Sequence, residues 1–510
     1  MLTESDLKQI QDHGLTVDDV VKQLQTYNKG ISKTPIITPA SIDNGICKLD
    51  REQQQYFVDY YDQHKVKKDI VKFVPASGAA TRMFKFLHSF LKDYDPASET
   101  LKAYLKRTED HQLKQFLDSL KELPFVNEVR KKIRSLYPDY KHQKKGLRSY
   151  LFVKTMLEAD GLNYSSLPKG LIPFHRYTKY WVTAFEEQLY EAAFYASAND
   201  KVFLHFTFSE EHLSHFKQTY DSIRNRVSKK TKKEFHISYS FQKKSTDTLA
   251  VTTENQPFRD ESGQLVLRPS GHGALIENLN DVDADIVFIK NIDNVVVESY
   301  VDKIAFQKKV LAGKLLKLQH QIFAYAQLLE NEDPSLEKLK EINAFIWKEL
   351  NVKDLPNSKI ELQYILNRPL RVCGVVRNTG ATGGGPFWVK NETGNVSLQI
   401  VESAQIDLND PHQRQLLNDA THFNPVDIVC GVRDYQGKTF DLSNYIDHRS
   451  GFIAEKSWSG RSLKALELPG LWNGAMAKWN TAFIEVPLIT FNPVKTVNDL
   501  LNKEHLPTTI

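Results

Sequence analysis

The stretch KFVPASGAATRMFK, residues 72–85, decides the fold. An apolar run that is typical of a buried strand breaks into alanine, serine and glycine before Thr81 and Arg82. In open parallel sheets, ligands bind at the carboxyl ends of strands, where loops and helix N-termini meet. The stretch therefore predicts a strand, a loop with little side-chain bulk and a helix that begins near Thr81.

The small-residue loop has two interpretations. Its members are Ala76, Ser77, Gly78, Ala79 and Ala80. The backbone amides of such a loop and of Thr81 can approach a phosphate closely, a helix start adds its positive end, and Arg82 supplies a guanidinium. The alternative is a tight turn whose small residues only pack. The loop is neither a Walker loop nor a GxGxxG dinucleotide-binding turn.

Strand and helix patterns alternate beyond this loop, as in the strand VFLHFTF (202–208), the helical run that follows it and the strand EFHISYSF (234–241). Such alternation predicts an α/β fold, Rossmann-like, with a mixed and mostly parallel sheet and helices on both faces. Along the chain we expect a helical N-terminal segment at 1–68, an α/β core at 69–300 with a helical, basic insertion at about 84–160, a helical segment at 301–360, and a C-terminal α/β portion at 361–510 that completes the substrate side.

The composition of the chain limits the cellular compartment and the partners that we expect for it. Lysine and arginine number 67 against 63 acidic residues, so a net charge of +4 on 510 residues gives no argument for nucleic acid. Three cysteines without a CxxC pair indicate a reducing compartment. The polar start MLTESDLKQIQDHG is not a signal sequence, and no window approaches the roughly 18 apolar residues of a membrane span. We expect a soluble, cytoplasmic protein with no membrane partner.

Two later loops carry residues that suit a nucleotide. Lys169 lies in LPKGLIP (167–173), where it is either a surface lysine or a cation above a reacting phosphate. Gly271, His272 and Gly273 open a helical pattern, and two glycines beside one ring suit the close approach of a flat base. The alternative for the second loop is an ordinary turn with an incidental histidine.

A carboxylate follows the buried strand pattern at 285–289. In NIDN (291–294), Asp293 stands just beyond the carboxyl end of that strand. Mg²⁺ takes one or two carboxylates together with substrate phosphates, so Asp293 suits a Mg²⁺ site. An aspartate that only caps a turn has the same local pattern.

Taken in order, the segments ASGAATRM (76–83), LPKGLIP, PSGHG (269–273) and NIDN resemble the motifs of the UDP-sugar pyrophosphorylases, nucleotidyltransferases that activate sugars. The whole chain also resembles domain-of-unknown-function family 4301, a group related to that superfamily. The resemblance implies a nucleotide-diphospho-sugar transferase fold of the GT-A type. Two features depart from it: Ser77 and Ala80 stand where the superfamily has glycine, and the insertion at 84–160 separates the first two motifs.

The resemblance also implies a reaction. The phosphate of an acceptor, a sugar-1-phosphate, attacks the α-phosphate of a nucleoside triphosphate, with UTP favoured, and pyrophosphate leaves. Arg82 and Lys169 would be catalytic, the first holding pyrophosphate and the second neutralising charge near the α-phosphate or the sugar phosphate. The loop 76–81 would bind the phosphates, residues 271–273 would line the base or ribose pocket, and Asp293 would hold Mg²⁺.

Two C-terminal features complete the set of candidates. Gly383, Gly384 and Gly385 precede an aromatic strand and form either a loop across the sugar or a wide turn. Asn480 stands roughly where related enzymes place a second metal ligand, although an amide is a poorer Mg²⁺ ligand than a carboxylate.

Two other functions stay open. A glycosyltransferase that uses nucleotide sugars needs an acidic D-x-D near a strand end, and DVDAD (281–285) has this spelling but precedes its strand. A non-catalytic nucleotide- or RNA-binding protein would use the basic runs at 130–148 and 228–235. Charge runs more often form solvated helix faces, and acidic residues elsewhere cancel the excess, so nucleic acid is the disfavoured partner.

Overall fold

The computed structural model describes residues 2–76, 78, 80–380, 383–390, 394–423 and 426–507. The chain forms two compact units. Unit 1 comprises Met1–Phe73, Ser240–Ile289 and Gln307–Thr490, and unit 2 comprises Val74–Tyr239, Lys290–Phe306 and Phe491–Ile510. Each unit thus combines segments that lie far apart in the sequence, unlike the four consecutive parts expected along the chain. None of the helices in the described ranges combines the length and apolar character that a membrane crossing needs.

Unit 1 is built on a mostly parallel sheet, as the alternating pattern predicts. Its strand order is β2-β3-β19-β13-β16-β12-β4. The strands are β2 (Ser41–Ile42), β3 (Gly45–Cys47), β19 (Asn480–Glu485), β13 (Leu370–Val375), β16 (Asp427–Gly431), β12 (Ile286–Ile289) and β4 (Ile70–Pro75), the last of which passes into unit 2 at Val74. Only β16 runs antiparallel to its neighbours among these pairs. Every residue of β12, β13 and β16 is buried, which explains their uninterrupted apolar runs.

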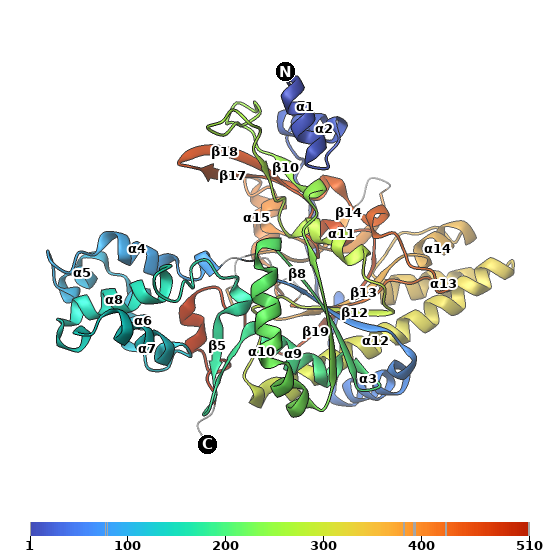
Figure 1. The fold of residues 1–510 in the computed structure, drawn as a ribbon. Coiled ribbons are helices and arrows are strands. Elements are labelled where there is room, and N and C mark those ends of the chain that lie inside the picture. Colours follow the sequence, from blue (N-terminus) through green and yellow to red (C-terminus); the bar gives the residue numbers. More distant parts are fainter. Residues whose placement is uncertain are drawn as a thin grey trace. The chain divides into compact units, whose positions relative to one another are not determined.

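Helices accompany this sheet in unit 1. They are α3 (Arg51–His64), α11 (Leu275–Asn280), α12 (Glu298–Asn331, in unit 1 from Gln307), α13 (Leu336–Leu350), α14 (Lys359–Leu366) and α15 (Pro411–Asn418). Figure 1 shows α12, α13 and α14 beside the sheet that contains β13. A second, antiparallel sheet has the order β1-β14-β15, formed by β1 (Ile36–Pro39), β14 (Gly385–Lys390) and β15 (Val396–Val401).

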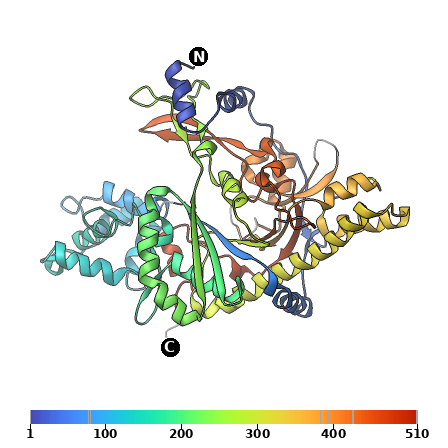
Figure 2. The ribbon, with the colours of Figure 1, turned by 45° about the vertical axis from the view of Figure 1, so that its right-hand side comes forward.

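The N-terminal helices of unit 1 pack on a pair of hairpins. The helices are α1 (Glu4–Asp12) and α2 (Val17–Lys29), and the hairpin strands are β10 (Thr248–Leu249), β11 (Leu267–Arg268), β17 (Phe452–Trp458) and β18 (Arg461–Glu467). Both helices begin with a capping box, from Thr3 to Asp6 and from Thr16 to Asp19. Ile10 and Val20 share one buried cluster with Leu249 and Leu466. Figure 2 shows α1 and α2, in dark blue, next to the β17–β18 hairpin.

Unit 2 combines a small sheet with helices. The end of β4 is followed in the sheet order by β8 (Lys201–Phe208) and β7 (Ser197–Ala198), and β9 (Glu234–Phe241) pairs with β8. Outside the basic insertion, unit 2 also contains the hairpin of β5 (Pro173–Arg176) and β6 (Trp181–Thr183), α9 (Ala184–Tyr195) and α10 (Leu213–Thr231). Helix α9 has an amphipathic sequence pattern, yet every residue except Phe194 is buried. Its three glutamates are buried with partners: Glu186 pairs with Arg226, Glu191 with Lys290 and Glu187 with His175.

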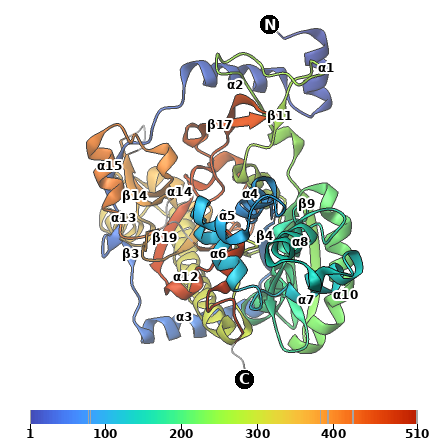
Figure 3. The same cartoon turned by 90° about the vertical axis from the view of Figure 1, so that its left-hand side faces the viewer.

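The basic insertion is helical, as its sequence predicts. It contains α4 (Lys85–Asp93), α5 (Leu101–Thr108), α6 (His111–Asp118), α7 (Val126–Leu136) and α8 (Lys145–Leu157). Figure 3 shows these helices as one group in unit 2. Apolar side chains of the group, including Phe90, Phe116, Val129 and Met156, are completely buried, so the insertion helices are packed and not an extended basic arm.

Candidate functional site

Three of the four predicted motifs meet in unit 2, and Lys169 is their common point. Lys169 begins a 3₁₀ turn, Lys169–Leu171, that follows Pro168. Its Nζ donates to Oδ2 of Asp293 at 2.7 Å and to the backbone oxygen of Val494 at 2.7 Å. The side chains of Lys169 and Asp293 are 15% and 16% exposed, so the ion pair is accessible from solvent but largely enclosed. The structure therefore joins the predicted catalytic lysine to the predicted metal ligand.

The small-residue loop and the lysine loop hold each other through their backbones. The amide of Lys169 donates to the backbone oxygen of Gly78 at 3.1 Å, and the amide of Ala80 donates to that of Leu167 at 3.3 Å. These bonds fix Lys169 next to the small-residue loop. Among the described residues, a Cβ at Gly78 would meet no atom within 4 Å, so no described group crowds the loop at this residue.

Packing between the ends of two strands brings Asp293 to the same place. The amide of Ile292 donates to the backbone oxygen of Pro75 at 3.2 Å, and the amide of Ala76 donates to that of Thr207 at 2.8 Å. Gly170 lies against this junction, because a Cβ there would be 3.0 Å from Cγ1 of Ile292. The glycine after Lys169 thus lets the lysine loop pack closely on the segment that carries Asp293.

Two expectations about the small-residue loop need correction. The chain forms only a short 3₁₀ turn, Ala80–Arg82, and the α-helix begins at Lys85 instead of near Thr81. Ala80 is completely buried and its amide is already bonded, so this amide is not available to a phosphate, and its methyl group packs inside the protein. Ser77 and Ala79 lie outside the described residues. Their predicted role, and that of Gly78, stays a prediction.

Arg82 and Thr81 are exposed beside this loop. The guanidinium of Arg82 has no hydrogen bond or ion pair with the part of the chain that the structure describes. A free guanidinium of this kind can reach an anionic ligand, because its five donors are not committed elsewhere.

Sequence reasoning missed the C-terminal segment 491–507, which contacts all three motifs. The amide of Val494 donates to the backbone oxygen of Asp293 at 3.3 Å, while its own carbonyl accepts from Lys169. The amide of Val497 donates to the backbone oxygen of Met83 at 3.1 Å. These contacts use backbone atoms of apolar residues, so no side-chain motif in this segment could have revealed them.

The fourth motif lies in unit 1 and has a packing explanation of its own. A Cβ at Gly271 would be 2.3 Å from Oε2 of Glu467, and one at Gly273 would be 2.1 Å from the backbone oxygen of Pro469. The ring of His272 stacks on Trp472 with centroids 4.6 Å apart, and its Nδ1 accepts from the amide of Leu471 at 3.0 Å. Gly271 and Gly273 are needed because a larger residue at either position would clash with Glu467 or Pro469. A base-lining role for the motif stays a prediction.

The C-terminal candidates also lie in unit 1. A Cβ at Gly384 would be 2.0 Å from the backbone oxygen of Val401, and one at Gly385 would be 2.8 Å from that of His422, so both glycines serve strand packing. Gly383 has a φ of 157° and begins the described chain after the gap at 381–382. A sugar-facing role for the three glycines stays a prediction.

Asn480 does not occupy a position suited to a metal. It is completely buried at the first residue of β19, the amino end of that strand, and its amide group donates to the backbone oxygen of Ile365 at 2.8 Å. Its Oδ1 has no hydrogen-bond partner among the described atoms. No carboxylate of the described chain bonds to this side chain, so a second ligand that could help to hold a metal ion is not seen beside it. The structure therefore gives the weak metal assignment of Asn480 no support.

A cluster that the sequence did not reveal surrounds Glu485, at the carboxyl end of β19 in unit 1. Its carboxylate is 3.0 Å from Nε2 of His422, 3.2 Å from Nε of Arg377 and 3.5 Å from Nζ of Lys48. Burial raises the pKa of Glu485, but the bonds from His422 and Arg377 outweigh it, so the pKa is lowered overall. His422 is 2% exposed, so its ring is buried beside Glu485. Only the three-dimensional pairing of distant segments brings these residues together.

Asp293 is the candidate carboxylate for a divalent cation. Within the described ranges, no group of three or more histidine, cysteine, aspartate or glutamate side chains is arranged to hold a metal ion. One carboxylate does not form a closed metal site, but it fits Mg²⁺ that arrives with phosphate ligands, because Mg²⁺ keeps several waters and uses few protein carboxylates. The site in unit 2 thus offers a cation, a carboxylate and a low-bulk loop, a combination that suits a phosphate ester with its metal ion.

Comparison with known proteins gives a family and two groups of structures. A family model described as Domain of unknown function (DUF4301) matches residues 3–506. No curated protein sequence matches the chain. A structure of UDP-glucose phosphorylase from Trypanosoma brucei aligns with 98% of this chain and 77% of that chain, at 13% identity and a TM-score of 0.46. UDP-glucose pyrophosphorylase of Leishmania major, with UDP-glucose, aligns with 98% and 79%, at 13% identity and a TM-score of 0.42. Scores of this size carry no argument about activity.

Proposed function

The chain belongs to the DUF4301 family, and on that premise we propose that it is a nucleotidyltransferase, which moves a nucleoside monophosphate from a nucleoside triphosphate to a phosphorylated acceptor and releases pyrophosphate. One observation carries the proposal: Lys169, Asp293 and the small-residue loop, which belong to segments far apart in the sequence, are bonded into one site in unit 2. The order and spelling of the motifs, which resemble those of UDP-sugar pyrophosphorylases, support it.

The reaction requires positioning and charge neutralisation more than covalent chemistry. An oxygen of the acceptor phosphate forms a bond to the α-phosphorus, the bond from that phosphorus to the oxygen bridging to the β-phosphate breaks, and pyrophosphate leaves with the bonding electrons. Negative charge grows on the phosphoryl oxygens during this exchange. Lys169 is fixed by its loop where its ammonium can neutralise that charge, and Arg82, exposed and unpaired among the described residues, can hold the departing pyrophosphate.

Asp293 would hold Mg²⁺ that enters with the triphosphate. When bound there, the ion would polarise a phosphoryl oxygen and offset its charge. The second oxygen of the carboxyl group and the exposed edge of the side chain leave room for such a ligand, since Asp293 uses Oδ2 for Lys169. Mg²⁺ dependence is thus part of the proposal.

The bond between Lys169 and Asp293 gives a reason for the two ligands to bind together. Without ligand, each side chain neutralises the other. A free triphosphate that drew Lys169 away would leave Asp293 unpaired, and a free metal ion on Asp293 would leave Lys169 unpaired. The magnesium complex of the triphosphate supplies a partner to both charges at once, so it should bind much better than either component alone.

The nature of the substrates rests on the motif resemblance. It favours UTP as the donor and a sugar-1-phosphate as the acceptor, and the small-residue loop is compatible with any nucleoside triphosphate. A glycosyltransferase is less well supported, because Asp283 and Asp285 of DVDAD both pair with Arg433 and precede β12. Their carboxylates therefore already have a cationic partner in unit 1.

The test is a pyrophosphate-release assay with the five common nucleoside triphosphates, Mg²⁺ and a panel of sugar-1-phosphates. Lys169→Ala and Asp293→Ala are the test variants. Lys179→Ala and Asp302→Ala are matched controls, because both residues are exposed in unit 2. We expect release that needs one triphosphate and one acceptor and that survives only in the controls. Release that persists in both test variants would refute the assignment of the site.

A further inference from the structure

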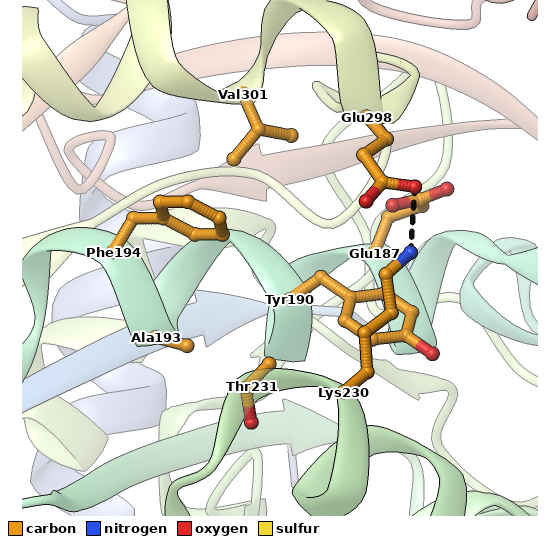
Figure 4. Close-up of a pocket in the computed structure, with 8 residues that line it drawn as sticks. All are labelled: Glu187, Tyr190, Ala193, Phe194, Lys230, Thr231, Glu298 and Val301. Atoms are coloured by element: carbon orange, nitrogen blue, oxygen red, sulfur yellow. Dashed lines mark hydrogen bonds and ion pairs between the residues drawn. The ribbon is translucent and has the colours of Figure 1, made fainter.

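A cavity of about 200 Å³ lies in unit 2, between helices α9, α10 and the start of α12. The residues that line it are Glu187, Tyr190, Ala193, Phe194, Lys230, Thr231, Glu298 and Val301. Figure 4 shows Ala193, Phe194 and Val301 at one end and the charged side chains at the other. The cavity therefore has an apolar end and a polar end. None of its lining residues belongs to the site proposed above.

Two of the charged side chains satisfy each other. Nζ of Lys230 donates to Oε2 of Glu298 at 2.6 Å, and it lies 4.6 Å from the centre of the Tyr190 ring and 5.6 Å from that of Tyr177. The ion pair and the two rings account for the charge of this lysine. Lys230 and Glu298 together therefore add no net charge to the cavity.

Glu187 is different, because only half of its carboxyl group is satisfied. Its side chain is 3% exposed, and Oε1 is 2.8 Å from Nδ1 of His175 and 2.9 Å from the hydroxyl of Tyr177. Its Oε2 has no hydrogen-bond partner in the described part of the chain. Figure 4 shows the carboxyl group beside Lys230 and Glu298, at the polar end of the cavity.

Burial and a chain of hydrogen bonds together place the proton on Glu187. Burial lowers the pKa of His175 to about 3, and burial with the adjacent His175 lowers that of His505 to about 3, so both rings are neutral at pH 7. Nε2 of His505 lies 3.2 Å from the backbone oxygen of Asn492, which only accepts, so Nε2 carries the hydrogen and Nδ1 accepts. Nε2 of His175, 2.9 Å from that Nδ1, must then donate.

The other ring nitrogen of His175, Nδ1, faces the carboxyl group of Glu187. In the neutral ring Nδ1 of His175 carries no hydrogen, so Oε1 of Glu187 donates to it and Glu187 is a neutral carboxylic acid. Transfer of that proton to His175 would create two buried charges, which burial disfavours. Burial acts in the same direction, since it raises the pKa of Glu187 to about 8. Oε2 is therefore a carbonyl-like acceptor that lacks a donor, in a cavity whose other polar groups are paired.

We propose that this cavity is a second ligand site, which takes a small uncharged molecule that carries one hydroxyl group on an apolar body. The hydroxyl donates to Oε2 of Glu187, and the body packs on Ala193, Phe194 and Val301. The volume is adequate, since an engineered cavity of about 150 Å³ holds benzene. A carboxylate or phosphate is disfavoured because it would face Oε2 of Glu187 and would have to displace Glu298 from the ammonium of Lys230. An ammonium group would require Glu187 to ionise and break the fixed chain of donors.

The test compares four probes of one size: benzyl alcohol, toluene, benzylamine and benzoate. Binding to the full chain is measured by ligand-observed NMR titration at pH 7. We expect benzyl alcohol to bind roughly fivefold more tightly than toluene, because one neutral hydrogen bond is gained, and benzoate and benzylamine to bind more weakly than either. Equal binding of toluene and benzyl alcohol would overturn the role of Oε2, and tighter binding of benzylamine would overturn the neutral form of Glu187. Absence of binding by all four would overturn the site.

Two variants locate the binding. Ala193→Leu fills the apolar end without touching Glu187, and we expect it to abolish binding of benzyl alcohol. Glu187→Gln retains an acceptor toward the cavity and a donor toward His175, so benzyl alcohol should still bind. A folded Ala193→Leu protein, with an unchanged melting temperature, that binds benzyl alcohol as the wild type does would place the ligand elsewhere and refute the proposal.

Discussion

The ammonium of Lys169 lies 2.7 Å from Oδ2 of Asp293, although 123 residues separate the two in the sequence, at positions 169 and 293. The bond joins a loop before β5 to the segment after β12, and the carbonyl of Val494 adds a bond to Lys169 from a third segment, the C-terminal one. Under the proposed function, this pairing should favour a ligand that carries both an anion and a cation, such as a magnesium–triphosphate complex.

Removing the lysine should abolish transfer while leaving the fold intact. We expect Lys169→Met to lower the rate of nucleotidyl transfer by roughly a hundredfold or more, the usual effect of losing one positioned charge at a transition state. Single-turnover measurements check this, with Lys179→Met as the exposed control. An equal loss in both variants would show that the effect is not specific to the site.

Gly78→Ala separates ligand binding from folding. A Cβ at this residue meets no atom of the described chain within 4 Å, so the free energy of unfolding should stay unchanged or rise by up to about 1 kcal/mol. If the loop faces the phosphates, the added methyl group should nevertheless weaken binding of the magnesium–triphosphate complex. Urea unfolding and a nucleotide titration on the same sample give both numbers. Unchanged affinity would remove the loop from the phosphate site.

Gly170 should show a measurable coupling to Ile292. Gly170→Val places a branched side chain where even a Cβ would be 3.0 Å from Cγ1 of Ile292, so we expect destabilisation of about 1–3 kcal/mol. Ile292→Ala removes the opposing atoms. In a double-mutant cycle, the double variant should be more stable than the sum of the two single effects predicts. Simple additivity would contradict the close packing of the two loops.

The stability of the fold should pass through a maximum with pH because of Glu187, His175 and His505. The pKa of Glu187 is raised from 4.5 to about 8, so its contribution to stability is full below 4.5 and is lost as the pH rises to 8. The pKa of each histidine is lowered from 6.5 to about 3, so their contribution is full above 6.5 and is lost as the pH falls toward 3. The two opposite pH dependences together place the maximum of the free energy of unfolding near pH 6.5.

Glu187→Gln isolates the loss of stability that accompanies a rise in pH toward 8, because glutamine cannot release a proton. Between pH 6.5 and 8, the free energy of unfolding of the wild type relative to this variant should fall by about 1.4 kcal/mol per pH unit, the value for one proton. Urea unfolding across this range checks it, and groups common to both proteins cancel in the difference. A difference independent of pH would show that Glu187 is ionised in the folded chain.

The sequence was sufficient to predict the α/β fold and part of the site. The pattern of small residues after β4 and of Asp293 after β12 follows from a general property of parallel sheets, whose strand ends gather at one edge. The start of α4 at Lys85 was not predictable in this way, because the 3₁₀ turn before it is held by the distant oxygen of Leu167.

Other parts of the structure depend on long-range pairing that leaves no local pattern. The carbonyl of Val494 binds Lys169 through the backbone, so its side chain gives no signal. Glu187 has the sequence context of a solvated helix face, yet His175 and Tyr177 make its burial possible. His422 is buried in the same way, by Glu485 at the end of β19.

The most direct test of nucleotidyl transfer follows a label on the α-phosphate of UTP in a single turnover with Mg²⁺ and sugar-1-phosphates. The account predicts that the label moves to one acceptor in the wild type and in Lys179→Ala, and stays on UTP in Lys169→Ala and Asp293→Ala. Transfer of the label in the last two variants, or no transfer in any protein together with no rise in melting temperature with magnesium and triphosphate, would contradict it.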